Sequence, residues 1–109
     1  MTKGTLWHTL VKMKPFRWNH EKNERLKVER GISFEEIVLA IEADGLVDVL
    51  QHANPARYPN QSVLVVAVDD YAYLVPFVEE VDYYFLKTII PSRKATRDYL
   101  RLGDEHEET

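Results

Sequence analysis

Cysteine is absent from this 109-residue chain, which excludes a disulfide framework and a thiolate metal site. Glycine is scarce: its four residues are isolated and form no phosphate-binding loop. The four histidines lack the spacing of metal ligands, so we expect neither a metal nor a cofactor. No apolar run approaches the ~20 residues of a membrane-spanning helix, and no signal peptide is visible, which makes a cytoplasmic protein the expectation.

Charge is unevenly distributed along the chain, whose net charge is −4. Residues 12–30 carry seven Lys or Arg against three Glu, a local +4. Residues 31–82 carry one Arg against ten acids, a local −9, whereas residues 83–101 carry five bases against one Asp and return to +4. If the two basic segments meet in space, they form a positive patch that the net charge does not report.

Apolar periodicity and turn residues predict one domain over residues 1–109, with 1–12 as an extension and 104–109 as a flexible acidic tail. The expected elements are a strand at 14–18, helices at 20–30 and 33–45, strands at 46–51, 62–68, 71–78 and 83–90, and a helix from Ser92 to about Gly103. The short connections favour an α+β fold, an antiparallel sheet with its helices gathered on one face.

Capping residues and prolines mark the boundaries of these elements. Asn19, Ser33 and Ser92 are placed to cap helices, and Gly31 is placed to end the first helix. Pro91 is expected to end strand pairing, because proline has no N–H to donate. For the same reason, Pro76 indicates an edge position or a bulge within its strand.

The chemistry left after these exclusions is cationic. Lys87 on the last strand, Arg93 and Lys94 at the helix start, and Arg97 one turn later form a cluster. Such cations neutralise charge that grows on a phosphate in the transition state, and RNA supplies its own nucleophile in the 2′-hydroxyl. From the pattern alone, however, a strand followed by a basic helix is more often a binding surface than a nuclease.

Two segments near the ends of the chain resemble the BrnT-type toxin family. The first is Phe16-x-Trp18-Asn19-x-x-Lys22-Asn23-x-x-Leu26, followed by Arg30-Gly31-Ile32-Ser33-Phe34-Glu35-Glu36. The second is Ile89-Ile90-Pro91-Ser92-Arg93-Lys94-Ala95-Thr96, and together the two frame about 85 residues. The chain departs from the family in having Arg30 where a histidine is common, and the run from Phe85 to Thr88 is not a family hallmark.

The resemblance implies a RelE-like fold and a metal-independent endoribonuclease within a type II toxin–antitoxin system. The partners it implies are an RNA substrate and an antitoxin with a ribbon-helix-helix DNA-binding part, which alone would contact operator DNA. No membrane partner is expected.

The residues quoted above then acquire expected roles. Arg93, supported by Lys94, would stabilise the scissile phosphate, and Lys87 would orient it or assist proton transfer. Arg30 would make a second phosphate contact. The residues expected to steer the RNA backbone are Lys22, Arg25 and Arg97, although Lys22 and Arg25 also suit a plain solvated helix face. The alternative is a degenerate toxin, a non-catalytic module that binds protein or nucleic acid.

Overall fold

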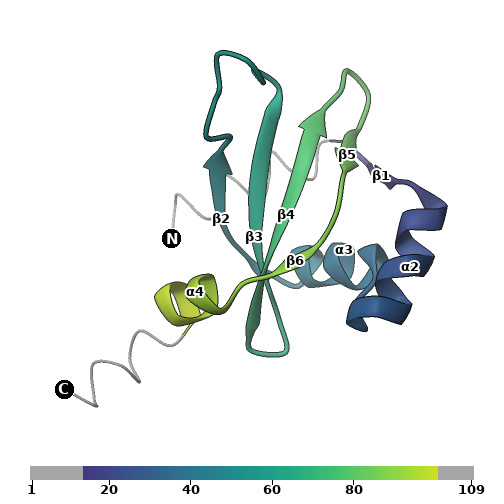
Figure 1. The fold of residues 1–109 in the computed structure, drawn as a ribbon, viewed down its shortest axis with the longest axis vertical. Helices are drawn as coiled ribbons and strands as arrows, with labels where there is room; N and C mark the ends of the chain where they lie inside the picture. Colours follow the sequence, from purple (N-terminus) through teal and green to yellow (C-terminus); the bar gives the residue numbers. More distant parts are fainter. Residues whose placement is uncertain (1–13, 101–109) are drawn as a thin grey trace.

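The computed structural model describes residues 14–100 and has the α+β layout that the sequence predicts, a strand, two helices, a meander and a final helical segment (Figure 1). Its elements are β1 (Phe16–Trp18), α2 (His20–Arg30), α3 (Phe34–Glu42), β2 (Leu46–Gln51), β3 (Gln61–Val68), β4 (Tyr71–Glu79), β5 (Tyr84–Leu86), β6 (Ile90–Pro91), α4 (Arg93–Ala95) and a π-helical turn, η1 (Thr96–Leu100). The predicted extension at 1–12, helix end near Gly103 and acidic tail at 104–109 lie outside the described residues.

The strands form one sheet in the order β1-β5-β4-β3-β2, and β6 pairs with β4 farther along the line of β5. The meander from β2 to β6 is antiparallel, as expected. β1 differs, because it joins β5 as a parallel neighbour with Phe16 opposite Tyr84. The strand at the beginning of the described chain and the strand near its end therefore lie side by side.

Helices cover both faces of this sheet, so the expectation that they gather on one face is wrong. α2 and α3 pack on the face that carries Leu64, Val66 and Val75, here called the α2–α3 face. Ala95 and Leu100 pack on the opposite face, here called the α4 face, against Val65, Ala72 and Leu74. The physical reason is the unbroken apolar run at 63–68, which presents hydrophobic side chains on both faces and needs cover on each.

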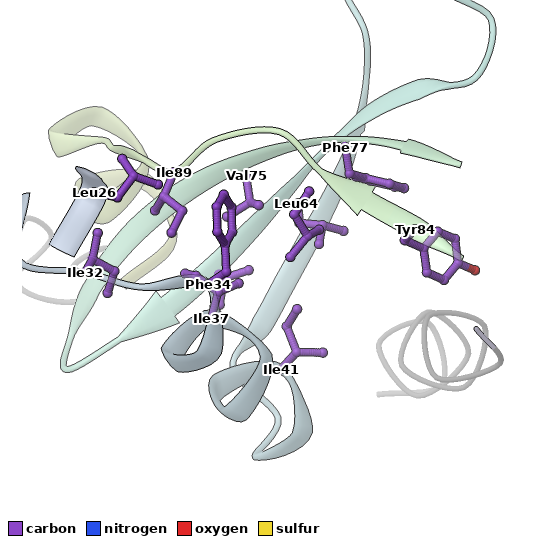
Figure 2. Close-up of a cluster of buried hydrophobic side chains, with 12 residues drawn as sticks. Leu26, Ile32, Phe34, Ile37, Ile41, Leu64, Val75, Phe77, Tyr84 and Ile89 are labelled. Atoms are coloured by element: carbon purple, nitrogen blue, oxygen red, sulfur yellow. The ribbon is translucent and has the colours of Figure 1, made fainter. Parts of the chain in front are cut away.

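The main core lies between α3 and the sheet (Figure 2). Phe34, Ile37 and Ile41 recur on one side of α3 and are fully buried, as the periodicity predicts. The ring of Trp18 stacks on Phe34 with their centroids 5.6 Å apart, which fixes the end of β1 against the start of α3.

Asn23 joins the two long helices through a buried amide. Its Oδ1 accepts the Phe34 N–H at 2.8 Å, and its Nδ2 donates to Glu35 Oε1 at 2.8 Å. Asn23 is 1% exposed, so in the intact fold these two partners satisfy its amide. The bond from Asn23 also lowers the pKa of the Glu35 carboxyl. This contact fixes the direction of α2, and with it the position of the basic residues at its end.

Capping geometry confirms the predicted starts of the three helical segments and the predicted end of α2, whereas α3 ends at Glu42, before the predicted end at 45. Asn19 Oδ1 accepts the Lys22 N–H at 2.8 Å, and Gly31 ends α2 with φ at 66°, in the left-handed region. Ser33 Oγ accepts the Glu36 N–H at 3.2 Å, and Ser92 Oγ accepts the Ala95 N–H at 3.0 Å. These are local signals, so they could be found in the sequence.

The prediction of an edge position or a bulge in the strand of Pro76 is wrong, because β4 is a central strand and the extra residue lies in the strand opposite it. Lys87 N–H donates to Pro76 O at 2.8 Å, so the nitrogen of Pro76 points to the same side and has no hydrogen to offer there. Phe77 of β4 pairs with Leu86, and Leu74 of β4 pairs with Ile90. Three positions along β4 are thus matched by four positions along the opposite strand. The extra residue is a bulge between β5 and β6.

The expectation that Pro91 ends strand pairing is wrong. Pro91 lies opposite Tyr73, and the next residue still donates its N–H, from Ser92 to Ala72 O at 3.0 Å. Successive N–H groups point to opposite sides of a strand, so the nitrogen of Pro91 lies on the outer edge. The missing N–H of Pro91 therefore removes no hydrogen bond from the pairing of β6 with β4.

Gly45 connects α3 to β2 at a point where no side chain fits. A Cβ at Gly45 would lie 2.7 Å from Ala40 O and 2.8 Å from Ala67 O, both of them backbone atoms. Gly45→Ala is therefore expected to lower the free energy of unfolding by about 1–3 kcal/mol, measured by urea denaturation. The matched control is Gly31→Asn, since Gly31 has open space around it and asparagine tolerates the left-handed conformation. Equal losses for the two variants would contradict the close packing at Gly45.

Candidate nucleic-acid interface

Arg30 ties the end of α2 to the strand that leads into α4. Its Nη1 donates to the backbone oxygen of Ile89, 59 positions away in the sequence. Ile89 is fully buried between β5 and β6, whereas Arg30 is exposed. In Figure 1 the chain runs from β5 through β6 and then turns into α4. A residue of the first basic segment is thus in contact with the second.

Arg93 follows this contact closely along the chain. Four residues separate it from Ile89, and four residues of fully extended chain span at most ~14 Å. Arg30 approaches β6 from α2, while Arg93 begins the segment that crosses to the α4 face. Arg93 is therefore close to Ile89 along the backbone, although Arg30 comes from the α2–α3 side of the sheet and Arg93 begins the segment on the α4 face. α4 has only three residues, which is too short for its helix dipole to form an anion site.

Thr96 holds this segment on the sheet, a role that we did not predict. Its buried Oγ1 accepts the Ala72 N–H at 2.8 Å and donates to Ser92 O at 2.8 Å. The Arg-Lys-Ala-Thr motif contains the residue, but only the fold reveals its partner in β4. Arg93 therefore lies in a segment that hydrogen bonds hold to β4 at Ser92 and again at Thr96.

Asp98 pairs with two of the four residues in the predicted cationic cluster. Its carboxylate accepts from Lys94 Nζ at 2.8 Å and from Arg97 Nε at 3.3 Å. The Lys94 contact, then the Arg97 contact, lowers the pKa of Asp98. Within the described chain, Arg93 and Lys87 have no ion pair. They are the cations of the cluster that keep their charge uncompensated.

Lys87 lies on the α4 face by strand alternation. Leu86 is buried on the α2–α3 face, so the next side chain points the other way, and Lys87 is exposed. Its backbone N–H is held by Pro76 O, beside the bulge. Lys87 and Arg93 thus share the α4 side of the sheet and flank the short β6.

Lys22 and Arg25 are less closely associated with β6. Leu26 and Asn23 turn one side of α2 toward the core. At ~100° per residue, Arg25 lies ~140° around the helix from Arg30 and Lys22 lies ~80° from it. Neither has an ion pair among residues 14–100. Arg30 contacts Ile89 O just before β6, and Lys87 and Arg93 precede and follow β6 along the chain, whereas Lys22 and Arg25 have no such contact within residues 14–100.

Tyr99 anchors the turn η1 to the edge strand, and this contact too was missed. Its hydroxyl donates to Asp48 Oδ2 at 2.6 Å, while Asp48 Oδ1 accepts the Val49 N–H at 2.8 Å. Asp48 lies at a bulge in β2, where the pairing with β3 shifts between Leu46 and Asp48. Asp48 therefore holds the final helical segment to the edge strand β2.

The Tyr99 contact has a measurable titration. The hydrogen bond to Asp48, followed by burial, raises the pKa of Tyr99 to about 12, from 10.0. Its neutral phenol therefore stabilises the fold fully below pH 10, and that contribution is lost as the pH rises through about 12. We expect the phenolate absorbance difference between the protein and Tyr99→Phe to have a midpoint near 12. In the background of Asp48→Asn the midpoint should return toward 10, and an unchanged midpoint there would contradict the assignment.

Comparison with protein-family models, curated proteins and solved structures gives no match. The likeness to BrnT-type toxins therefore remains a prediction that rests on the quoted motifs. Residues 14–100 contain no group of three or more His, Cys, Asp or Glu that could hold a metal ion. None of the helices described here is long and apolar enough to cross a membrane.

Proposed function

We propose that this chain is a BrnT-like toxin of a type II toxin–antitoxin system that cleaves RNA without a metal. The supporting observation is the hydrogen bond from Arg30 to Ile89 O, because it brings one basic segment against the strand that leads into the other. A site that must neutralise a phosphate needs cations from at least two directions. The two segments, separated by an acidic middle, supply them here.

Each cation has a role in this proposal. Arg93, which has no ion pair in the described chain, binds the scissile phosphate and stabilises its growing charge. Arg30 has five N–H donors and uses one on Ile89, so its orientation is fixed while other donors are available to the same phosphate. Lys87 orients the phosphate from the α4 face. Lys94, with its Asp98 partner, supports the turn beside Arg93.

Proton transfer is the step that separates this function from its alternative. The 2′-hydroxyl must lose a proton and the 5′-oxygen must gain one, and Lys87 is the cation of the group that can exchange a proton. The two described histidines are elsewhere: His20 begins α2, ten residues before Arg30, and His52 contacts Tyr58. This shortage of acid–base groups favours, as a second candidate, a degenerate toxin that binds RNA or protein without cleavage.

The antitoxin would cover the same cations in either case. A cationic surface formed by Arg30, Lys87 and Arg93 suits an acidic or amphipathic segment of a partner, which neutralises the charges that RNA would otherwise meet. Operator DNA would then be contacted through the partner's ribbon-helix-helix part and not by this chain.

Purified protein incubated with total RNA in EDTA tests the proposal. We expect cleavage that is indifferent to the chelator and leaves 2′,3′-cyclic phosphate ends, as attack by the 2′-hydroxyl requires. RNA that stays intact but is retained in a salt-sensitive complex would replace the nuclease with the binding module. Intact RNA with no retention would reject the nuclease and the RNA-binding form of the degenerate toxin.

A further inference from the structure

The α4 face of the sheet is only partly covered by the described helices. Ala95 and Leu100 pack over the part near Val47, Val65, Ala72 and Leu74. In Figure 1, α4 lies across the lower end of the strands, on the β2 side, and away from β5 and β1. The side chains of this face toward the β5–β1 margin, all partly exposed, are those of Pro76, Val78 and Phe85.

Aromatic rings and cations are interleaved on this uncovered part. Arg17 in β1 lies opposite Phe85 in β5, and its guanidinium carbon is 5.0 Å from the centroid of the Tyr83 ring. Lys87 lies two residues beyond Phe85 on the same face and is exposed. We call Tyr83 and Phe85 the aromatic platform. Its flanking charges are positive on two sides, from Arg17 and from Lys87.

We propose that unpaired bases of single-stranded RNA stack on this aromatic platform while Arg17 and Lys87 bind the adjoining phosphates. An exposed sheet that carries aromatic rings between cations has the chemistry that such strands require, since every base has a stacking surface and every linkage a negative charge. The charges argue against a plain apolar partner, which would leave Arg17 and Lys87 without compensation.

The two ends of the platform differ in charge. Glu80 and Asp82 lie in the turn before Tyr83, but Lys14 donates to Glu80 O and Arg17 lies over the Tyr83 ring, so that end of the platform carries charges of both signs. Lys87 at the other end leads toward β6 and Arg93. The inference rests on the proposed function: a strand that stacks on Phe85 continues past Lys87 to the phosphate site. The platform would thereby select unpaired RNA over duplex RNA.

Phe85→Leu tests the inference, because leucine keeps apolar bulk on the sheet and removes the ring. Binding is followed by fluorescence anisotropy with a labelled ten-nucleotide RNA that carries 2′-O-methyl groups and cannot be cleaved. We expect the Kd of Phe85→Leu to rise about five- to hundred-fold, the range for loss of one stacked base, with an unchanged salt dependence. An abasic strand of the same length should bind both proteins equally.

Matched variants separate stacking from other losses. Val78→Ala removes apolar surface directly opposite Phe85 without removing a ring, and Phe85→Tyr keeps the ring, so both should bind nearly as the unaltered protein does. Arg17→Ala and Lys87→Ala should each lower the slope of log K against log salt by about one. A Kd unchanged in Phe85→Leu would overturn the platform even if RNA is cleaved. Failure of the unaltered protein to bind or cleave any RNA would instead reject the proposed function, and the platform with it.

Discussion

Replacing Arg93 with alanine is expected to lower the rate of RNA cleavage by about 10²- to 10³-fold, the loss typical of one group that stabilises transition-state charge. Arg93 is exposed and makes no ion pair within the described chain, so its removal should change the free energy of unfolding by no more than ~0.5 kcal/mol. Initial rates on a labelled oligonucleotide and a thermal denaturation curve measure the two effects. In cells, the same variant should no longer arrest growth.

Arg97→Ala is the matched control for this prediction. It removes the same side chain one turn later, from a residue that already contacts Asp98. Its rate should fall about tenfold at most, since it is expected to steer the RNA backbone at a distance from the scissile bond. Equal losses in Arg93→Ala and Arg97→Ala would show a general electrostatic effect and remove Arg93 from a specific role.

Replacing Asn23 with alanine is expected to produce the largest loss of stability among exchanges of polar residues. The change leaves the buried Phe34 N–H without its acceptor and opens a void between α2 and α3. Together these should lower the free energy of unfolding by about 2–4 kcal/mol, which corresponds to a fall in Tm of roughly 10 °C or more in a domain of this size. Urea and thermal denaturation measure it.

Glu35→Ala is the control for the Asn23 prediction. It removes the other partner of the Asn23 amide, but Glu35 is exposed, so water can take its place at Nδ2. Its cost should be about 1 kcal/mol or less. Stability of Asn23→Ala within 0.5 kcal/mol of the unaltered protein would contradict the account of the buried amide.

The local features of this fold could be predicted from the sequence because they depend on near neighbours. Asn19 and Ser33 accept hydrogen bonds from N–H groups three residues away. The spacing of the apolar residues along α3 indicates which side of that helix is buried. The missing donor of Pro76 indicated an irregular position, but not that the extra residue lies in the opposite strand. The strand, helix, helix and meander order follows from these boundaries and from short connections.

Features that depend on distant partners could not be predicted in the same way. Asn23 appeared only as part of a family motif, whereas its function in the fold comes from Phe34, eleven positions away in another helix. The crossing of α4 to the second face depends on which strands Ala95 meets. Likewise, the pairing of Asp48 with Tyr99 depends on a bulge that the alternating pattern of β2 conceals.

The candidate site shows the same division. Sequence alone indicated which residues are cationic and that two basic segments exist, but not that Arg30 reaches Ile89 or that Asp98 takes up Lys94 and Arg97. These contacts change which residues are expected to contribute most to RNA binding and cleavage. Arg93, Lys87 and Arg30 are the strongest candidates, and Arg97 is reduced to a supporting charge.

In the proposed nuclease site, Arg30 and Arg93 bind one and the same phosphate group. The most direct test follows the arginine Nε–H signals by NMR during titration with a short 2′-O-methyl RNA, with Arg30→Lys and Arg93→Lys used to assign them. If the two arginines bind one phosphate, both signals shift along a single binding curve with one Kd. A shift of the Arg93 signal while the Arg30 signal stays in place at saturation would contradict it.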